Sequence, residues 1–231
     1  MKLSVVVPAY NEEKTVAGVL RAHADLGRRL AGEVEVIVCD DGSTDGTSAA
    51  IAAAAADHPE IRRLRNATNV GIPATMKRLY AEARGDWVYF TPADGQVPVG
   101  ALATMWHARD EAALVVGRRV PRRDPLSRVL IAELYSSVLR FIFRLPIKDI
   151  DSVKLYRGDD LRSLSVRSRS NFFEAEMLIT LCRRQRSVRE VDIEHRPRIA
   201  GVAKGVTPAN AALAMWELVR FMLSDFVRAR R

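Results

Sequence analysis

The chain has 231 residues, a formal net charge of +8 at pH 7 and 48% hydrophobic residues. This length and composition are typical of one sizeable globular domain, and they argue against a large independent second domain. No run approaches the roughly 18 apolar residues that cross a bilayer, and Pro8 interrupts the only apolar run near the start, so we expect neither a membrane span nor a signal peptide.

The charge is divided unevenly along the chain. Residues 1–117 carry more acidic than basic side chains, whereas residues 118–231 are strongly basic. This division indicates a cation-binding part joined to a surface that meets anions. The basic half has few aromatics among its arginines and no zinc-finger, RNP or helix-turn-helix pattern, so we expect no nucleic-acid partner. Cys39 and Cys182 lack C-x-x-C spacing and are interpreted as reduced packing residues of a cytoplasmic protein.

The first half alternates short β-branched runs with helix-length segments of 3.6-residue periodicity. Strands are predicted at 3–8, 34–40, 61–66, 86–92 and 113–117, and helices at 13–30, 44–56, 72–83 and 99–109. This alternation predicts an α/β fold with a mostly parallel sheet covered by helices on both faces. In such sheets ligands collect beyond the carboxyl ends of the strands, which here carry the polar segments PAYNEE, CDDGSTDG, NATNVG and TPADGQ.

The second half is predicted to contain more helix. Long helical patterns cover 126–144 and 208–230, and between them lie the segment SVKLYR at 152–157, a helix around 172–182 and a strand at 188–195. The last helix combines Trp216, Phe221 and Phe226 with terminal arginines, which is typical of an amphipathic helix lying on an anionic membrane. Packing against the domain or a second subunit is the alternative.

Several common catalytic motifs are missing. The sequence has no G-x-G-x-x-G after the first strand and no G-x-x-x-x-G-K-[ST], which argues against a dinucleotide oxidoreductase and a nucleoside-triphosphate hydrolase. It also lacks the patterns of zinc deaminases, zinc proteases and serine hydrolases.

Three segments occur in order with compact spacing: SVVVPAYNEE, VIVCDDGSTDGT and NVGIPATMKRLYAEARGDWVYFTPADGQ. Together they resemble the inverting family 2 glycosyltransferases with the Rossmann-like GT-A fold, and the resemblance covers about the first 117 residues. It implies a nucleotide-sugar-binding half at 1–117, an acceptor-binding half of the same domain at 118–207, and a C-terminal amphipathic helix at 208–231.

The same resemblance implies a binding site for a GDP- or UDP-linked sugar. Residues lining the base, ribose and diphosphate would be Pro8, Tyr10, Glu12, Cys39 through its backbone, Asp41, Ala93 and Asp94. Asp40 would brace the loop. The alternative for the acidic residues is capping of the helix that follows, which stabilises a helix by itself.

The family usually holds Mg²⁺ or Mn²⁺ with an Asp-x-Asp at the end of its fourth strand and a following glutamine. The matching positions here are Pro92, Ala93 and Asp94, followed by Gln96, so one carboxylate is missing. Because hard cations accept one or two carboxylates plus phosphate oxygens and water, Asp94 and Gln96 with a diphosphate would still complete a metal shell. We expect weak metal affinity without the donor.

The segment HRPRIAGVAKG resembles the family's H-x-x-R-x-x-G-x-[ST]-K loop. By that resemblance Arg198 and Lys204 stabilise the leaving diphosphate, since opposite charge screens the developing anion.

The acceptor side resembles the polyprenyl-phosphate glycosyltransferases such as dolichol-phosphate mannose synthase. Arg119 and Arg128 would then bind the acceptor phosphate. Asp149 and Asp151 stay ambiguous: they are structural braces or phosphate-side contacts for a phosphate acceptor, which is already ionised, and a catalytic base for a hydroxyl acceptor.

Three functions follow from these observations. The first is a metal-dependent hexosyltransferase acting on polyprenyl phosphate, peripheral at the cytoplasmic face of the cell membrane and forming a homo-oligomer if the last helix pairs with another subunit. The second is a soluble family 2 transferase acting on a saccharide or small-molecule hydroxyl. The third is a catalytically inactive nucleotide-binding scaffold.

Overall fold

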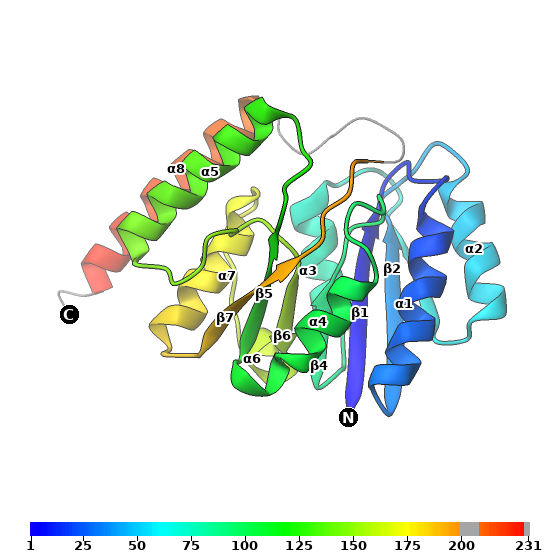
Figure 1. Cartoon of the computed structure of the whole chain (residues 1–231). Helices are drawn as coiled ribbons and strands as arrows, with labels where there is room; N and C mark the ends of the chain where they lie inside the picture. Colours follow the sequence, from blue (N-terminus) through cyan, green and yellow to red (C-terminus); the bar gives the residue numbers. More distant parts are fainter. Residues whose placement is uncertain (199–207, 229–231) are drawn as a thin grey trace.

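The computed structural model describes residues 1–198 and 208–228, and all that follows concerns these residues. They form one seven-stranded sheet flanked by helices (Figure 1). The strands are β1 Lys2–Ala9, β2 Glu33–Asp40, β3 Ile61–Arg65, β4 Trp87–Phe90, β5 Leu114–Arg119, β6 Lys154–Arg157 and β7 Val188–Ile193. The predicted strands and helices are all present, with boundaries shifted by a few residues.

The sheet has the order β3-β2-β1-β4-β6-β5-β7. Strands β1 to β4 are parallel where they pair, and β5 pairs with β7 in parallel. Strand β6 runs antiparallel to both β4 and β5. The predicted mostly parallel, GT-A-like α/β fold is therefore confirmed, and the antiparallel β6 joins the two halves of the sheet.

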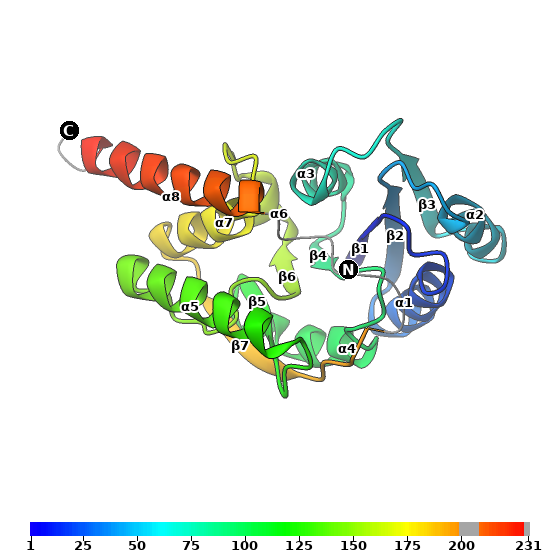
Figure 2. The same cartoon turned by 90° about the horizontal axis from the view of Figure 1, so that it is seen from above.

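Helices cover both faces of this sheet (Figures 1 and 2). They are α1 Val16–Leu30, α2 Thr47–Asp57, α3 Ile72–Glu82, α4 Gly100–His107, α5 Leu126–Phe143, α6 Gly158–Arg162, α7 Phe172–Arg183 and α8 Pro208–Arg228, with a 3₁₀ turn at Arg109–Glu111. Residues of α1, α2 and α4 share one hydrophobic core, and residues of α3, α6 and α7 share the other.

Strand β2 illustrates why the sheet is buried on both sides. Val36 and Val38 pack into the first core, whereas Ile37 and Cys39 pack into the second. Such continuous apolar runs are typical of strands covered on both faces. Both cysteines are free, as predicted, and Cys39 is buried.

Helix α8 is fixed to the domain along one edge. Glu217 accepts hydrogen bonds from the backbone N–H of Arg169 at 2.7 Å and of Ser170 at 3.0 Å, just before α7. Phe221 meets Phe172 edge to face, with ring centroids 5.6 Å apart. The buried Glu217 and Leu218 thus define the docked edge of α8.

The outer surfaces of α5 and α8 are unusually apolar. Large exposed side chains on these two helices are Leu126, Leu130, Ile131, Leu134, Val138, Phe141, Ile142, Leu213, Met215, Trp216, Val219, Met222 and Leu223. We call them the α5–α8 apolar surface. No helix in the described ranges is both long and apolar enough to span a bilayer.

Substituting Glu217→Ala is expected to loosen α8, because the backbone N–H groups of residues 169 and 170 lose a charged acceptor. Hydrogen bonds to charged groups contribute roughly 1.5–3 kcal/mol each, and Ser170 can turn to water, so we expect a loss of about 2–3 kcal/mol in urea unfolding. Met215→Ala, on the exposed side of the same helix, should change stability little. Equal stability of the two variants would contradict this role of Glu217.

Candidate functional site

The loops that follow β1, β2 and β4 gather at the carboxyl edge of the sheet, at the top in Figure 1. A cavity of about 160 Å³ opens here beside β4, β5 and β7. Residues lining it are Phe90, Pro92, Asp94, Gln96, Val97, Arg119, Asp151, Ser152, Val153, His195 and Arg198. The structure therefore brings five of the site residues predicted from the sequence into one cavity: Asp94, Gln96, Arg119, Asp151 and Arg198.

Asp94 is the buried carboxylate of this cavity, with 7% of the residue exposed. Its Oδ1 accepts a hydrogen bond from the Gln96 backbone N–H at 3.0 Å, and its Oδ2 accepts one from Arg198 Nη2 at 2.8 Å. Arg198 Nη1 lies 3.2 Å from Glu12 Oε1. One guanidinium thus joins the loop after β1 to the loop after β4.

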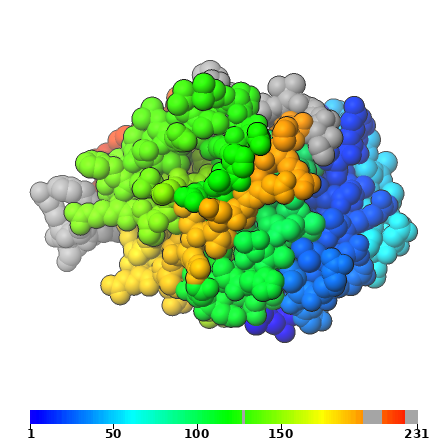
Figure 3. Space-filling view, viewed as in Figure 1, coloured from blue at the N-terminus to red at the C-terminus, as the bar shows by residue number. Residues whose placement is uncertain are grey.

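The chain after β7 reaches this position by crossing the front of the molecule. Figure 3 shows it in orange, running from the green C-terminal half towards the blue N-terminal half. Two contacts hold it there: the Arg196 N–H donates to the Gln96 carbonyl at 2.8 Å, and Gln96 Nε2 donates to the Arg196 carbonyl at 3.4 Å. Lys204 lies outside the described residues.

The chemistry of Asp94 and Gln96 fits a hard divalent cation only in part. The structure shows, for the residues it describes, no group of three or more His, Cys, Asp or Glu side chains suited to a metal. One carboxylate and one amide oxygen are offered, since the Gln96 nitrogen already donates to Arg196. Mg²⁺ and Mn²⁺ typically complete such a shell with phosphate oxygens and water, so these residues fit a metal that arrives with a diphosphate.

The loop after β2 begins near two carboxylates, Asp40 and Asp41, that accept hydrogen bonds from backbone N–H groups. Asp41 accepts hydrogen bonds from Asn66 Nδ2 at 2.7 Å and from the backbone N–H groups of Val70 at 3.0 Å and Gly71 at 2.9 Å. Gly71 has φ +86°, a conformation that glycine adopts readily. Asp41 therefore fixes the loop that leads into α3.

Asp40 braces its own loop, as predicted, because its Oδ1 accepts the Ser43 N–H at 2.9 Å. The other predicted donor-side residues lie at or after the ends of β1, β2 and β4. Pro8 and Cys39 are register partners in β1 and β2, and Ala93 is buried. Tyr10 and Glu12 are half-buried at the end of β1. Their predicted contacts with a nucleotide remain predictions.

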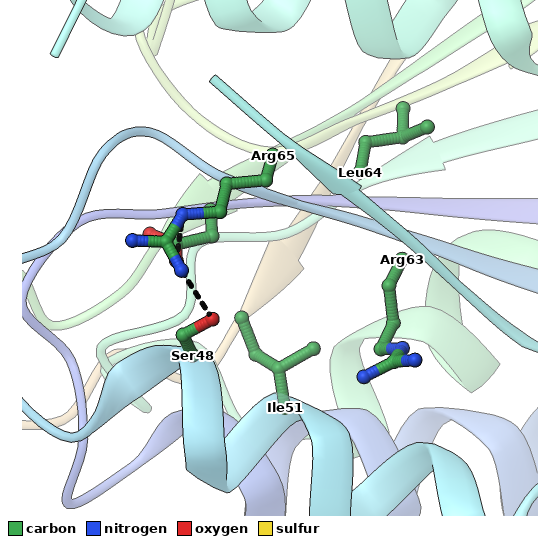
Figure 4. Close-up of a pocket in the computed structure, with 6 residues that line it drawn as sticks. Ser48, Ile51, Arg63, Leu64 and Arg65 are labelled. Carbon is green, nitrogen blue, oxygen red and sulfur yellow. Dashed lines mark hydrogen bonds and ion pairs between the residues drawn. The ribbon is translucent and has the colours of Figure 1, made fainter. Parts of the chain in front are cut away.

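A second hollow of about 250 Å³ lies between α2 and β3 (Figure 4). Arg65 Nη1 donates to Ser48 Oγ at 2.9 Å across it, and Arg65 Nε lies 3.7 Å from Asp40 Oδ2. Because Arg65 already balances the buried Asp40 carboxylate, we interpret this hollow as support for the loop after β2.

Arg119 and Asp149 form a nearly buried ion pair at the side of the cavity that is predicted to bind the acceptor. Arg119 Nε and Nη2 donate to the two Asp149 oxygens at 2.8 and 2.7 Å. Burial opposes ionisation of Asp149, but the hydrogen bonds and charge of Arg119 outweigh it and lower the pKa of the carboxyl below its ordinary 3.8. Asp149 therefore positions Arg119 and is a poor base. The side chain of Arg128 lies outside the described residues.

Asp151 lines the cavity, and the residue is exposed. The surrounding protein raises the pKa of its carboxyl above the ordinary 3.8, and the charges of Lys154 and Arg119 counteract this. Asp151 therefore lies where a general base for a hydroxyl acceptor would act.

Two features of the cavity were missed by the sequence analysis. His195 lines it, and its Nδ1 accepts the Arg123 N–H at 3.0 Å, so Nε2 carries the proton of the neutral ring. Burial, followed by the charge of Arg119, lowers the pKa of His195 below 6.5. The first position of the H-x-x-R pattern was the available signal for this residue.

The second missed feature is a buried polar cluster beneath residues 151–153. Lys154, with 0% exposure, pairs with Glu174 Oε2 at 2.8 Å and donates to the Ser152 carbonyl at 3.1 Å. Tyr80 and Tyr156 also donate to Glu174, at 3.1 and 3.2 Å. No sequence signal distinguishes this lysine from an exposed one at a strand end.

Comparison with known proteins places the chain in a family. The family model described as glycosyl transferase family 2 matches residues 4–162, more than half of the chain. The chain therefore belongs to glycosyl transferase family 2, as the motifs predicted.

Three individual relatives are named as undecaprenyl-phosphate or dolichyl-phosphate transferases. The chain is 29% identical over 216 residues to an undecaprenyl-phosphate mannosyltransferase of Micrococcus luteus, covering 88% of this chain and 87% of the relative. It is 32% identical over 142 residues to an undecaprenyl-phosphate 4-deoxy-4-formamido-L-arabinose transferase of Photorhabdus laumondii, covering 60% of this chain but 43% of that relative. A dolichyl-phosphate beta-glucosyltransferase of Trichomonas vaginalis is 28% identical over 214 residues, covering 82% of this chain and 62% of that relative.

Among solved structures, glucosyl-3-phosphoglycerate synthase of Mycobacterium tuberculosis, crystallised with Mn²⁺, UDP-glucose and phosphoglyceric acid, matches with a TM-score of 0.72. The match covers 93% of this chain and 76% of that one at 20% sequence identity. At this identity the likeness concerns the fold alone.

Substituting Asp149→Asn should destabilise the protein at neutral pH, because Arg119 would keep its charge with a weaker partner. Breaking a buried ion pair costs about 3–5 kcal/mol. The native carboxyl has a lowered pKa, so its contribution is present above 3.8 and is lost as the pH falls below that value. Urea unfolding at several pH values should show that the difference in free energy of unfolding between the parent and Asp149→Asn becomes smaller in acid.

The matched control is Asp192→Asn, which alters the more exposed Arg118–Asp192 pair. Exposed pairs contribute little, so we expect a small change. A stability loss for Asp149→Asn that stays constant down to strongly acidic pH would contradict the assigned ionisation.

Proposed function

We propose that this protein is an inverting glycosyltransferase that moves a hexose from a GDP- or UDP-linked sugar to a polyprenyl phosphate with the help of Mg²⁺ or Mn²⁺. The observation that carries the proposal is that Arg119, on the predicted acceptor side, and Asp94, on the predicted donor side, line one cavity. Three relatives, named as undecaprenyl-phosphate or dolichyl-phosphate transferases, support the acceptor class.

On the donor side, the leaving nucleoside diphosphate must be stabilised as its bond to the sugar breaks. Asp94 and Gln96 would hold the metal, which when bound supplies positive charge to the diphosphate. Arg198 is already at the cavity, and Lys204 is proposed from the sequence pattern to join it. Preorganised charges of this kind stabilise a developing anion in a site from which water is partly excluded.

On the acceptor side, a phosphate monoester is ionised at neutral pH and attacks without a general base. Its binding needs cationic groups, and Arg119 presents one held in a fixed orientation by Asp149. Arg128, near the start of α5, is proposed as a second phosphate ligand. Catalysis would then depend mainly on orienting the two substrates.

A hydroxyl acceptor is the second candidate, and the position of Asp151 in the cavity is the observation that favours it. Asp151 lines the same cavity and would remove the proton of a saccharide hydroxyl. The two candidates differ in whether Asp151 is needed for transfer.

We further propose that the α5–α8 apolar surface rests on the membrane that carries the acceptor, which would make the protein peripheral to the cytoplasmic face. Phe141 and Trp216 are 88% and 55% exposed on this surface. Arg220 stacks on the Trp216 ring at 5.4 Å, so a cation accompanies the aromatic group, as is typical of interfacial helices. Pairing with a second copy would make the protein a homo-oligomer.

Transfer should require both Asp94 and a phosphate acceptor. With labelled GDP- and UDP-sugars and Mn²⁺, we expect label in short-chain polyprenyl phosphate, and we expect Asp94→Ala to lower turnover by about a hundredfold or more while the circular dichroism spectrum stays unchanged. Asp110→Ala, an exposed carboxylate paired with Arg109, is the control.

The outcomes separate the candidate functions. Label in saccharide hydroxyls, abolished by Asp151→Asn, would favour the hydroxyl-acceptor enzyme. Nucleotide binding by calorimetry with no transfer or hydrolysis would mean a catalytically inactive scaffold. Undiminished turnover by Asp94→Ala would contradict the metal role of Asp94.

Membrane binding should depend on the α5–α8 apolar surface. Replacing Phe141 and Trp216 by serine should lower the affinity for anionic phospholipid vesicles, measured by co-sedimentation, by about tenfold or more. Burying one large apolar side chain contributes roughly 1.5–3 kcal/mol. Val70→Ser, an exposed apolar residue in the other half, should bind like the parent. Unchanged vesicle binding, with a dimer lost in light scattering, would instead assign the surface to a second copy.

A further inference from the structure

Arg198 contacts the Asp94 carboxylate that is proposed to bind the metal ion. Its Nη2 lies 2.8 Å from Asp94 Oδ2 and its Nη1 lies 3.2 Å from Glu12 Oε1. The three side chains are largely shielded, with 21% of Arg198, 13% of Glu12 and 9% of Asp94 exposed. These pairs are therefore less screened than surface ion pairs.

The three groups come from distant parts of the chain. Glu12 follows β1, Asp94 follows β4 and Arg198 follows β7. Glu12 is itself held, because its backbone N–H donates to Thr47 Oγ1 at 2.7 Å. The Asp94 carboxylate is oriented by the Gln96 N–H at 3.0 Å. Both acceptors of Arg198 are thus fixed before any ligand binds.

A guanidinium and a divalent cation cannot share Asp94 Oδ2 at full strength. Both need the same oxygen lone pairs, and their positive charges repel each other at short distance in a partly buried site. With only one acidic residue in the tripeptide Pro92-Ala93-Asp94, the site has no second carboxylate in that segment to hold the metal while Arg198 stays in place. Metal binding and the Arg198–Asp94 pair are therefore in competition.

We propose that Arg198 is an internal counter-ion of this site: it pairs with Asp94 and Glu12 in the empty enzyme and leaves Asp94 when a nucleoside diphosphate offers it another anion. This inference rests on the proposed function, because it assumes that the cavity binds a nucleoside diphosphate and a metal. Its consequence is that the metal and the nucleotide each strengthen binding of the other, as linkage requires.

The direct test is binding of Mn²⁺ alone, without nucleotide, followed by electron paramagnetic resonance. The parent protein should bind Mn²⁺ weakly. Arg198→Ala frees two carboxylates from a charge-assisted contact, so it should bind Mn²⁺ about tenfold or more tightly than the parent. Arg198→Lys, which keeps the charge but not the fork that spans two carboxylates, should lie between them.

Arg196→Ala is the matched control. Arg196 is two residues away, exposed and paired with Glu194, while its backbone contacts with Gln96 do not depend on its side chain. It should bind Mn²⁺ like the parent. If Arg198→Ala bound Mn²⁺ equally or more weakly than the parent, the counter-ion role would be overturned. If Arg198→Ala failed to fold, the order of the parent and Arg198→Lys would decide the question.

A second measurement separates this inference from the proposed function. The ratio of Mn²⁺ dissociation constants without and with GDP or UDP measures the coupling, and it should be large in the parent and about tenfold smaller in Arg198→Ala. An equal ratio in both proteins would overturn the coupling by Arg198. Sugar transfer is assayed separately, so a failure of transfer with the predicted ratio would refute the enzyme assignment alone.

Discussion

The site depends on one electrostatic constraint: a carboxylate largely shielded from water at the edge of a parallel sheet needs a cation beside it. Asp94 is that carboxylate, and in this structure Arg198 supplies the charge. Because Arg198 follows β7 whereas Asp94 follows β4, the ion pair connects the two halves of the sheet at the cavity. Asp94 and Arg119, proposed to act on the donor and on the acceptor, line one cavity with Arg198.

The uneven charge along the sequence has a structural counterpart here. The acidic first half contributes Glu12 and Asp94, and the basic second half contributes Arg119 and Arg198. The antiparallel β6 joins the halves by pairing with β4 on one side and β5 on the other. The cavity is therefore lined by both acidic and basic side chains, which are the groups that the proposed metal-bound donor and anionic acceptor would need.

Periodicity and turn residues sufficed to predict the strands other than β6 and the helices other than α6, because runs such as β2 are buried on both faces and have few alternatives. The motifs also brought out Asp94, Gln96 and Arg198, which meet in space. What could not be predicted depends on tertiary contacts: the direction of β6, the three hydrogen bonds that engage Asp41, and the burial of Lys154 against Glu174. The division of the chain at residues 117 and 207 stays a prediction.

The most direct measurement of the central claim is a crystal structure of the protein soaked with Mn²⁺ and a nucleoside diphosphate. The account predicts Mn²⁺ at Asp94 and Gln96, bridged to the diphosphate, with the Arg198 guanidinium turned from Asp94 onto phosphate oxygens. A cation bound elsewhere, or Arg198 still bridging Glu12 and Asp94 beside a bound diphosphate, would contradict it.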